Sequence, residues 1–149
     1  MTKTIELIVS LKVPDNTSIT ALATFHKLGY LKIKSLRRAD YYKFQIEGDA
    51  SKFKERISKV DILVNANKHS FDFAIKQDGA KKVLVKNSDD DGSGLLDLLK
   101  NRLGFKDLKK TSKATLWSLE IEDKDPEKLA DKAAKELLVN EHYQEYTII

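Results

Sequence analysis

An acidic segment, Asn87–Gly94, has the residue types that come nearest to metal chemistry. Calcium loops place oxygen ligands at positions 1, 3 and 5, a glycine at position 6 and a bidentate glutamate at position 12. With Asn87 at position 1, aspartates occupy positions 3 and 5, but position 12 is Leu98. Starting instead at Asp89 puts Lys100 there. Because the strongest ligand is missing in both registers, we expect a polar connector that caps the following helix, and no metal site.

Nucleophilic and phosphate-binding chemistry also lacks its usual residues. The chain has no cysteine, and therefore no thiolate nucleophile, no disulfide and no Cys-ligated metal. Its three histidines, His26, His69 and His142, are not spaced as metal ligands. No G-x-S-x-G motif, H-E-x-x-H motif or phosphate-binding glycine loop occurs. We therefore expect no catalytic residues and no cofactor in this chain.

Lysine supplies most of the positive charge. The chain has 27 Lys and Arg against 23 Asp and Glu, and only four of the basic residues are arginines. Because phosphate and base recognition favour the planar arginine fork, this composition favours solubility over nucleic-acid binding. No apolar run approaches the ~18 residues of a membrane span, and the N-terminus lacks the apolar region of a signal peptide. We expect a cytoplasmic protein without membrane association.

The elements that would position any functional group occur in two copies, 75 residues apart. Four separated blocks keep this offset without a gap, which indicates a duplicated structural unit. The paired blocks are Leu28-Gly29-Tyr30 with Leu103-Gly104-Phe105, Tyr42/Phe44/Ile46/Glu47 with Trp117/Leu119/Ile121/Glu122, Leu63-Val64-Asn65 with Leu138-Val139-Asn140, and Phe71/Phe73 with Tyr146/Ile148. We predict a first unit over residues 1–77 and a second over 80–149, joined by the polar connector Lys76–Ala80.

Each unit has the pattern of a strand–helix–strand–strand–helix–strand order. In the first unit, apolar residues alternate from Ile5 to Val13, and the first helix ends at Gly29. Separate strands are expected around Leu31–Arg38 and from Tyr42 onward. This βαββαβ order predicts an α+β fold of two tandem ferredoxin-like units with antiparallel sheets. A unit of about 75 residues is marginal alone, so we expect the two to bury bare sheet faces or edges together as a pseudo-dimer.

The same element order occurs in RNA-recognition motifs, which need a K/R-G-F/Y-G/A-F-V-x-F/Y run on the third strand. The corresponding run here, Asp40–Ile46, has neither the glycine nor the leading basic residue. The first strand, Glu6–Ser10, offers no aromatic side chain on which a base could stack. We expect Tyr42 and Trp117, which the repeat aligns, to be core residues and not ligand platforms, and RNA binding stays an alternative.

The repeated blocks carry a family resemblance. The motifs are the helix end Leu28-Gly29-Tyr30, the strand residues Ser35-Leu36-Arg37 with Tyr41, the turn Glu47-Gly48-Asp49, and Leu137-Leu138-Val139-Asn140 followed by Glu145-Tyr146. They resemble PurS, the small subunit of phosphoribosylformylglycinamidine (FGAM) synthase, once in each half of the chain. Ala39-Asp40 departs from the family's Gly-Lys, and Ser112 stands where the first copy has Arg37. The family's usual subunit is one unit that dimerises, so this chain resembles a tandem PurS-like form of it.

The resemblance implies a non-catalytic role in an ATP-dependent, glutamine-hydrolysing ligase complex of purine biosynthesis. The family's small subunit bridges the glutaminase and synthetase subunits and helps ammonia pass between them. Arg37, Arg38 and Tyr41 are the candidate partner-binding residues, because this block matches best and breaks the symmetry of the repeat. The alternative is a duplicated ferredoxin-like module that binds a ligand or RNA outside purine synthesis. Self-association of the pseudo-dimers stays open.

Overall fold

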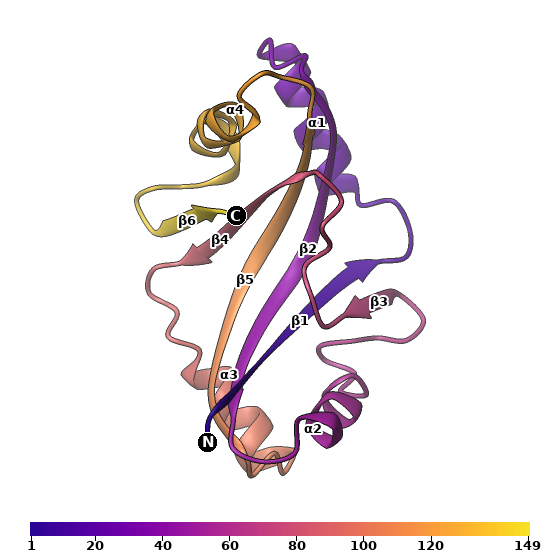
Figure 1. The fold of residues 1–149 in the computed structure, drawn as a ribbon, viewed down its shortest axis with the longest axis vertical. Coiled ribbons are helices and arrows are strands. Elements are labelled where there is room, and N and C mark those ends of the chain that lie inside the picture. The colour runs from indigo at the N-terminus through magenta and orange to yellow at the C-terminus, as the bar shows by residue number, and fades with distance from the viewer. The chain divides into compact units, whose positions relative to one another are not determined.

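A six-stranded sheet with four α-helices forms the α+β fold in the computed structural model, which describes all residues from Met1 to Ile149 (Figure 1). The strand order is β3-β1-β2-β5-β4-β6, and the pairings of β1 with β2 and β3, and of β4 with β5 and β6, are antiparallel. In chain order the elements are β1 (Lys3–Leu11), α1 (Asn16–Lys27), β2 (Ile33–Ile46), α2 (Ala50–Ile57), β3 (His69–Asp72), β4 (Lys81–Asn87), α3 (Ser93–Asp97) with the π-turn η1 (Leu98–Arg102), β5 (Leu108–Ile121), α4 (Pro126–Ala133) with the π-turn η2 (Ala134–Leu138), and β6 (Gln144–Ile148). None of the helices is both long enough and apolar enough to span a bilayer.

The element order repeats as β-α-β-α-β in each half of the chain. β5 begins and ends 75 residues after β2, with Leu108 corresponding to Ile33 and Ile121 to Ile46. The expected βαββαβ arrangement is not confirmed, because the two middle strands of each half form one long strand. The residues between the two expected strands, Ala39-Asp40-Tyr41, contain no glycine or proline that would turn the chain, and the backbone stays extended through them.

Strand register carries the repeat into the hydrogen-bonded structure. Leu7 lies opposite Tyr42 in the first half, and Val83 lies opposite Trp117 in the second. Tyr42 and Trp117 therefore hold equivalent places on β2 and β5, as the 75-residue offset predicts. Both are buried within apolar clusters, which confirms their expected place in the core.

Packing divides the chain into two compact units, each built from three segments. Unit 1 comprises residues Met1–Lys12, Asp40–Ile75 and Asp90–Lys113, and unit 2 comprises Val13–Ala39, Lys76–Asp89 and Ala114–Ile149. The sequence division 1–77 and 80–149 thus marks the repeat, whereas each packing unit draws on both copies. α1 belongs to unit 2 together with β4, α4 and β6, and α3 belongs to unit 1 together with β1, α2 and β3.

The two buried clusters show the same exchange of helices. In unit 1 the cluster consists of Ile5, Leu7, Val9, Tyr42, Phe44, Ile46, Phe53, Ile57, Leu63, Val64, Leu99, Phe105 and Leu108. In unit 2 it consists of Phe25, Tyr30, Ile33, Leu36, Val83, Val85, Trp117, Leu119, Ala130, Ala133, Ala134, Leu138 and Val139. Phe25 on α1 thus completes a core made largely by the second copy, and Leu99 on η1 completes a core made largely by the first.

Local signals in the sequence set the helix ends. Asp15 caps α1 by accepting a hydrogen bond from the backbone N–H of Thr17 at 3.1 Å. Gly29 follows the helix with a φ of 96°, a left-handed conformation that favours glycine. Asp125 caps α4 through the N–H of Lys128 at 3.1 Å, with Pro126 in the first helical turn. The expected caps at Gly29 and Asp125 are therefore confirmed.

Candidate functional site

Arg37, the first candidate residue, lies on β2 in unit 2 and is paired within the protein. Its guanidinium donates to Asp78 Oδ2 at 3.0 Å, and the Arg37 side chain keeps 63% of its surface exposed. The other oxygen of Asp78 accepts from the ammonium of Lys82 at 3.0 Å, and Lys82 also donates to Ser118 Oγ at 3.1 Å. The hydrogen bond from Lys82, aided by the N–H of Ala80 and by Arg37, lowers the pKa of Asp78 to about 2. Arg37 is thus the exposed end of a charged network that ties the connector to β4.

Arg38 forms the second charged contact, with the N-cap of α1. Its Nε donates to Asp15 Oδ2 at 3.0 Å, and a terminal nitrogen donates to Oδ1 at 3.2 Å. The same carboxylate accepts from Ser18 Oγ at 2.9 Å. Burial opposes ionisation of Asp15, but the Ser18 hydrogen bond and the Arg38 charge outweigh it and lower the pKa of the carboxyl. Because the Arg38 guanidinium also lies 5.9 Å from the centre of the Trp117 ring, it joins the helix cap to the core.

Tyr41, the third candidate, is a buried residue of unit 1. Its hydroxyl donates to Glu6 Oε2 at 2.6 Å, a short charge-assisted hydrogen bond across the β1–β2 pair. Burial and the neighbouring Glu6 carboxylate raise the pKa of the Tyr41 phenol well above its ordinary value. Tyr41 therefore presents little surface, whereas Arg37 presents most of its side chain. Partner binding by these residues stays a prediction.

The partners of the three candidates are what sequence reasoning missed. Asp15 carries a readable cap signal after Pro14, but nothing in the sequence pairs it with Arg38, 23 residues away. Asp78 lies in the connector, 41 residues from Arg37. Alternation along a strand predicts the face that a side chain occupies but not the loop residue that it meets there. All three polar contacts are long-range pairings of this kind.

The acidic segment uses its carboxylates to shape the start of α3. Asp90 Oδ1 accepts from the N–H of Gly92 at 2.8 Å, and Asp91 Oδ1 accepts from the N–H of Ser93 at 2.9 Å. Ser93 is the first residue of the helix, so the segment is a connector that leads into it, as expected. No group of three or more His, Asp or Glu side chains in the structure is arranged to hold a metal ion.

Two histidines have structural contacts. The Nε2 of His26 lies 2.8 Å from the carbonyl oxygen of Ile33, to which it donates. The Nδ1 of His69 accepts from the N–H of Asn65 at 3.0 Å. Both rings therefore fix the chain beside a helix end or a turn.

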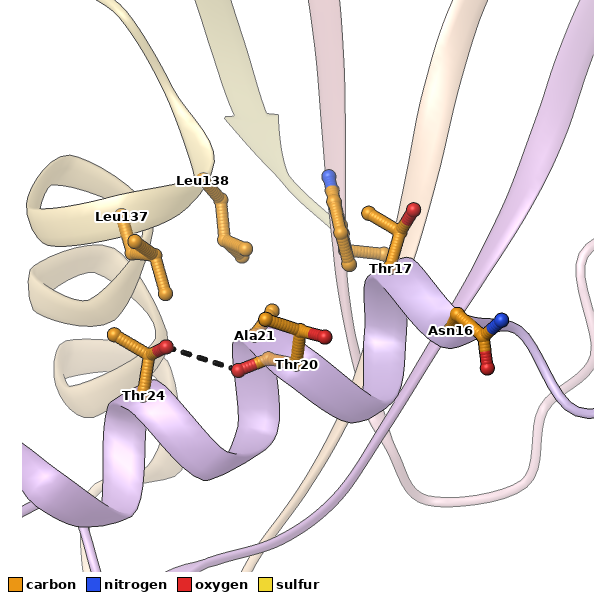
Figure 2. Close-up of a pocket in the computed structure, with 8 residues that line it drawn as sticks. Asn16, Thr17, Thr20, Ala21, Thr24, Leu137 and Leu138 are labelled. Atoms are coloured by element: carbon orange, nitrogen blue, oxygen red, sulfur yellow. Dashed lines mark hydrogen bonds between the residues drawn. The ribbon is translucent and has the colours of Figure 1, made fainter.

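Unit 2 also contains an open cavity between α1 and the segment that ends η2. Its volume is about 490 Å³, and it is lined by Asn16, Thr17, Thr20, Ala21, Thr24, Trp117, Leu137 and Leu138. Figure 2 shows Ala21 and Thr24 on α1 facing Leu137 and Leu138, with the Thr24 hydroxyl bonded to the Thr20 carbonyl. Trp117 is 8% exposed, so it is a core residue that also borders this space. No protein-family model matches the chain, and no curated protein matches it.

Proposed function

We propose that this chain is a non-catalytic assembly subunit of the PurS type, in which both copies of a dimer are fused into one polypeptide. It would bridge the glutaminase and synthetase subunits of FGAM synthase and help ammonia pass between them. The observation that carries the proposal is that the motifs of the resemblance act as structural turns in both halves. The same backbone contacts recur at each of them.

The Leu-Val-Asn motif is the clearest case. The N–H of Asn65 bonds to His69 Nδ1 at 3.0 Å, and the N–H of Asn140 bonds to Gln144 Oε1 at 2.9 Å. The Asn65 side chain accepts from Asn67 N–H, and the Asn140 side chain accepts from His142 N–H. All three pairs of positions are 75 residues apart, so the two turns are built alike although the bonded side chains differ.

A second recurring contact joins the two sequence copies within each unit. The N–H of Glu47 donates to the Asp107 carbonyl in unit 1 at 2.9 Å, and the N–H of Glu122 donates to the Lys32 carbonyl in unit 2 at 2.9 Å. Donor and acceptor exchange copies between the two bonds. Reciprocal contacts of this form are what a symmetric pair of identical subunits makes across its interface. They support the fused-dimer part of the proposal.

Reconstitution from purified subunits tests the assembly role. Glutamine-dependent synthase activity is measured with the glutaminase and synthetase subunits, with and without this chain. We expect activity and co-elution of the three proteins only when the chain is present, with no turnover by the chain alone. Full activity after its omission would contradict the proposal.

Arg37→Gln tests the exposed end of the candidate site, with Lys124→Gln as a control that removes one exposed positive charge elsewhere. If Arg37 docks a partner, its variant should weaken assembly several-fold at low salt and less at high salt. Equal affinities for the two variants would remove Arg37 from the interface and leave the assembly role to be judged by the omission experiment.

The alternative function, a ligand-binding module outside purine synthesis, is favoured by the cavity in unit 2. Co-elution with the two partner subunits separates the alternatives, because a free-standing module would not join the complex.

A further inference from the structure

The cavity in unit 2 has a mostly apolar floor and a polar rim. Trp117, Leu138 and Ala21 supply indole and aliphatic surface, and Ala21 packs against the buried cluster of the unit. Thr17, Thr20 and Asn16 add hydroxyl and amide groups along the first turns of α1. No hydrogen bond within this unit engages the hydroxyls of Thr17 and Thr20. Ligand sites of small molecules share this make-up, with apolar walls and a few polar groups.

The duplicated unit shows what the same place looks like without a cavity. Burial aligns α1 with α3 and η1, because buried Ser18 and Phe25 match buried Gly92 and Leu99. The half-buried positions of the two helices match in the same register. In that register Leu95 replaces Ala21 and Leu98 replaces Thr24, while Tyr42 replaces Trp117 on the strand. Leu95 packs against the buried cluster of unit 1, so a side chain occupies in one unit the space that Ala21 leaves in the other.

Trimming two leucine positions to alanine and threonine costs apolar contacts, and the loss grows with the volume of the space left behind. A cavity of about 490 Å³ lies within the range of small-molecule sites. The contrast between the two copies therefore distinguishes unit 2 as the copy with a binding site.

The lining residues indicate the chemistry of the ligand. None of the eight carries a formal charge, so the walls offer no ion pair to an anion or a cation. The indole of Trp117 favours a flat ring, and hydroxyl and amide groups favour a ring whose edge donates and accepts hydrogen bonds. We propose that this cavity binds an uncharged heteroaromatic compound of nucleobase or nucleoside size. This site goes beyond the assembly role and does not depend on it.

The single tryptophan of the chain lies in the cavity wall, so its emission reports binding directly. Adenosine, cytidine and uridine are titrated against the whole chain alone, with excitation at the red edge of the indole band. We expect a saturable change in emission together with a higher Tm at saturating nucleoside, as for any ligand that binds only the folded state.

Two substitutions copied from unit 1 provide the decisive variant. Ala21→Leu with Thr24→Leu should fill the cavity, keep the fold and weaken nucleoside binding by at least about tenfold. Ala23→Leu adds the same side chain to an exposed position of α1 and should leave binding unchanged. Circular dichroism and Tm show that each variant is folded.

Three outcomes would overturn the site: no saturable response to any nucleoside, a response that the filled variant retains, or binding of an RNA oligonucleotide without binding of free nucleosides. Because the assay contains no partner subunit, its failure leaves the assembly role intact, and failure of the reconstitution leaves this site intact.

Discussion

Replacing Asp78 by asparagine breaks the charged network that ties the connector to unit 2. Asp78 is the shared acceptor of Arg37 and Lys82, and the Lys82 side chain is only 7% exposed. Asparagine keeps the size of the side chain and an acceptor oxygen but removes the charge. The variant should therefore report on the ionic part of the network, with little change in packing.

The displaced pKa sets the size of the effect. A fall of the Asp78 pKa from 3.8 to about 2 corresponds to at most about 2.5 kcal/mol of stability in the ionised state. The Asp78 side chain is 30% exposed, and solvent screening reduces this to about 1 kcal/mol. Leaving the Lys82 ammonium with Ser118 as its remaining partner adds a further cost, because a buried charge without its counter-ion is destabilising. We expect a total loss of about 1–3 kcal/mol at neutral pH for Asp78→Asn.

The sign of the pH dependence follows from the direction of the shift. A carboxyl whose pKa is lower in the folded state stabilises the fold above its unfolded pKa, and that stabilisation is lost as pH falls through the folded value. The stability difference between wild type and Asp78→Asn should therefore be full at pH 5–7 and shrink between pH 4 and about 2. Urea unfolding followed by Trp117 emission at several pH values measures this difference.

Asp123→Asn is the matched control, because Asp123 pairs at 3.6 Å with Lys32, whose side chain is 63% exposed. This variant should lie within about 0.5 kcal/mol of wild type, as exposed pairs usually do. A loss for Asp78→Asn no larger than the control at neutral pH would refute the reasoning. A loss that persists undiminished near pH 2 would refute its electrostatic part.

Three further predictions concern the core, a turn and the acidic segment. Trp117→Ala should cost about 3–5 kcal/mol, measured by urea unfolding with circular dichroism, and wild-type emission should be blue-shifted and weakly quenched by iodide; strong quenching with a negligible stability loss would place the indole at the surface. Gly92→Ala should lower stability by more than about 1 kcal/mol, because its φ is 78° and a Cβ there would collide with the Thr111 carbonyl, while Gly94→Ala, which meets no atom within 4 Å, should be tolerated. Millimolar calcium should leave the Tm unchanged, because the segment Asn87–Gly94 lacks a bidentate glutamate, and an upward shift reversed by a chelator would show otherwise.

The parts of the fold that sequence reasoning predicts are those that depend on local or periodic signals. The burial of Tyr42, Phe44 and Ile46 on one strand face follows from alternation with period two, and Gly29 and Asp125 mark helix ends by their backbone preferences. The continuous course of β2 was missed, because an expected turn at Ala39-Asp40 rested on the change of pattern and not on turn residues.

The exchange of helices between the two copies lies beyond such signals. Phe25 has the spacing of a buried helix residue, but spacing says nothing about which of two similar cores receives it. For the same reason the candidate residues were found without their partners. Asp15, Asp78 and Glu6 meet Arg38, Arg37 and Tyr41 only after the chain has folded.

The exchanged helices also affect how the chain folds on the ribosome. α1 ends at Lys27, but the core that Phe25 enters includes residues as late as Val139. At a synthesis rate of about 5–20 residues per second, the apolar side of α1 waits roughly 5–20 s for its partners. Unit 1 can close once Lys113 has emerged, whereas unit 2 needs the last segment of the chain, Ala114–Ile149. Folding therefore proceeds from unit 1 to unit 2 during synthesis, and α1 is the segment that most needs shielding by chaperones in the interval.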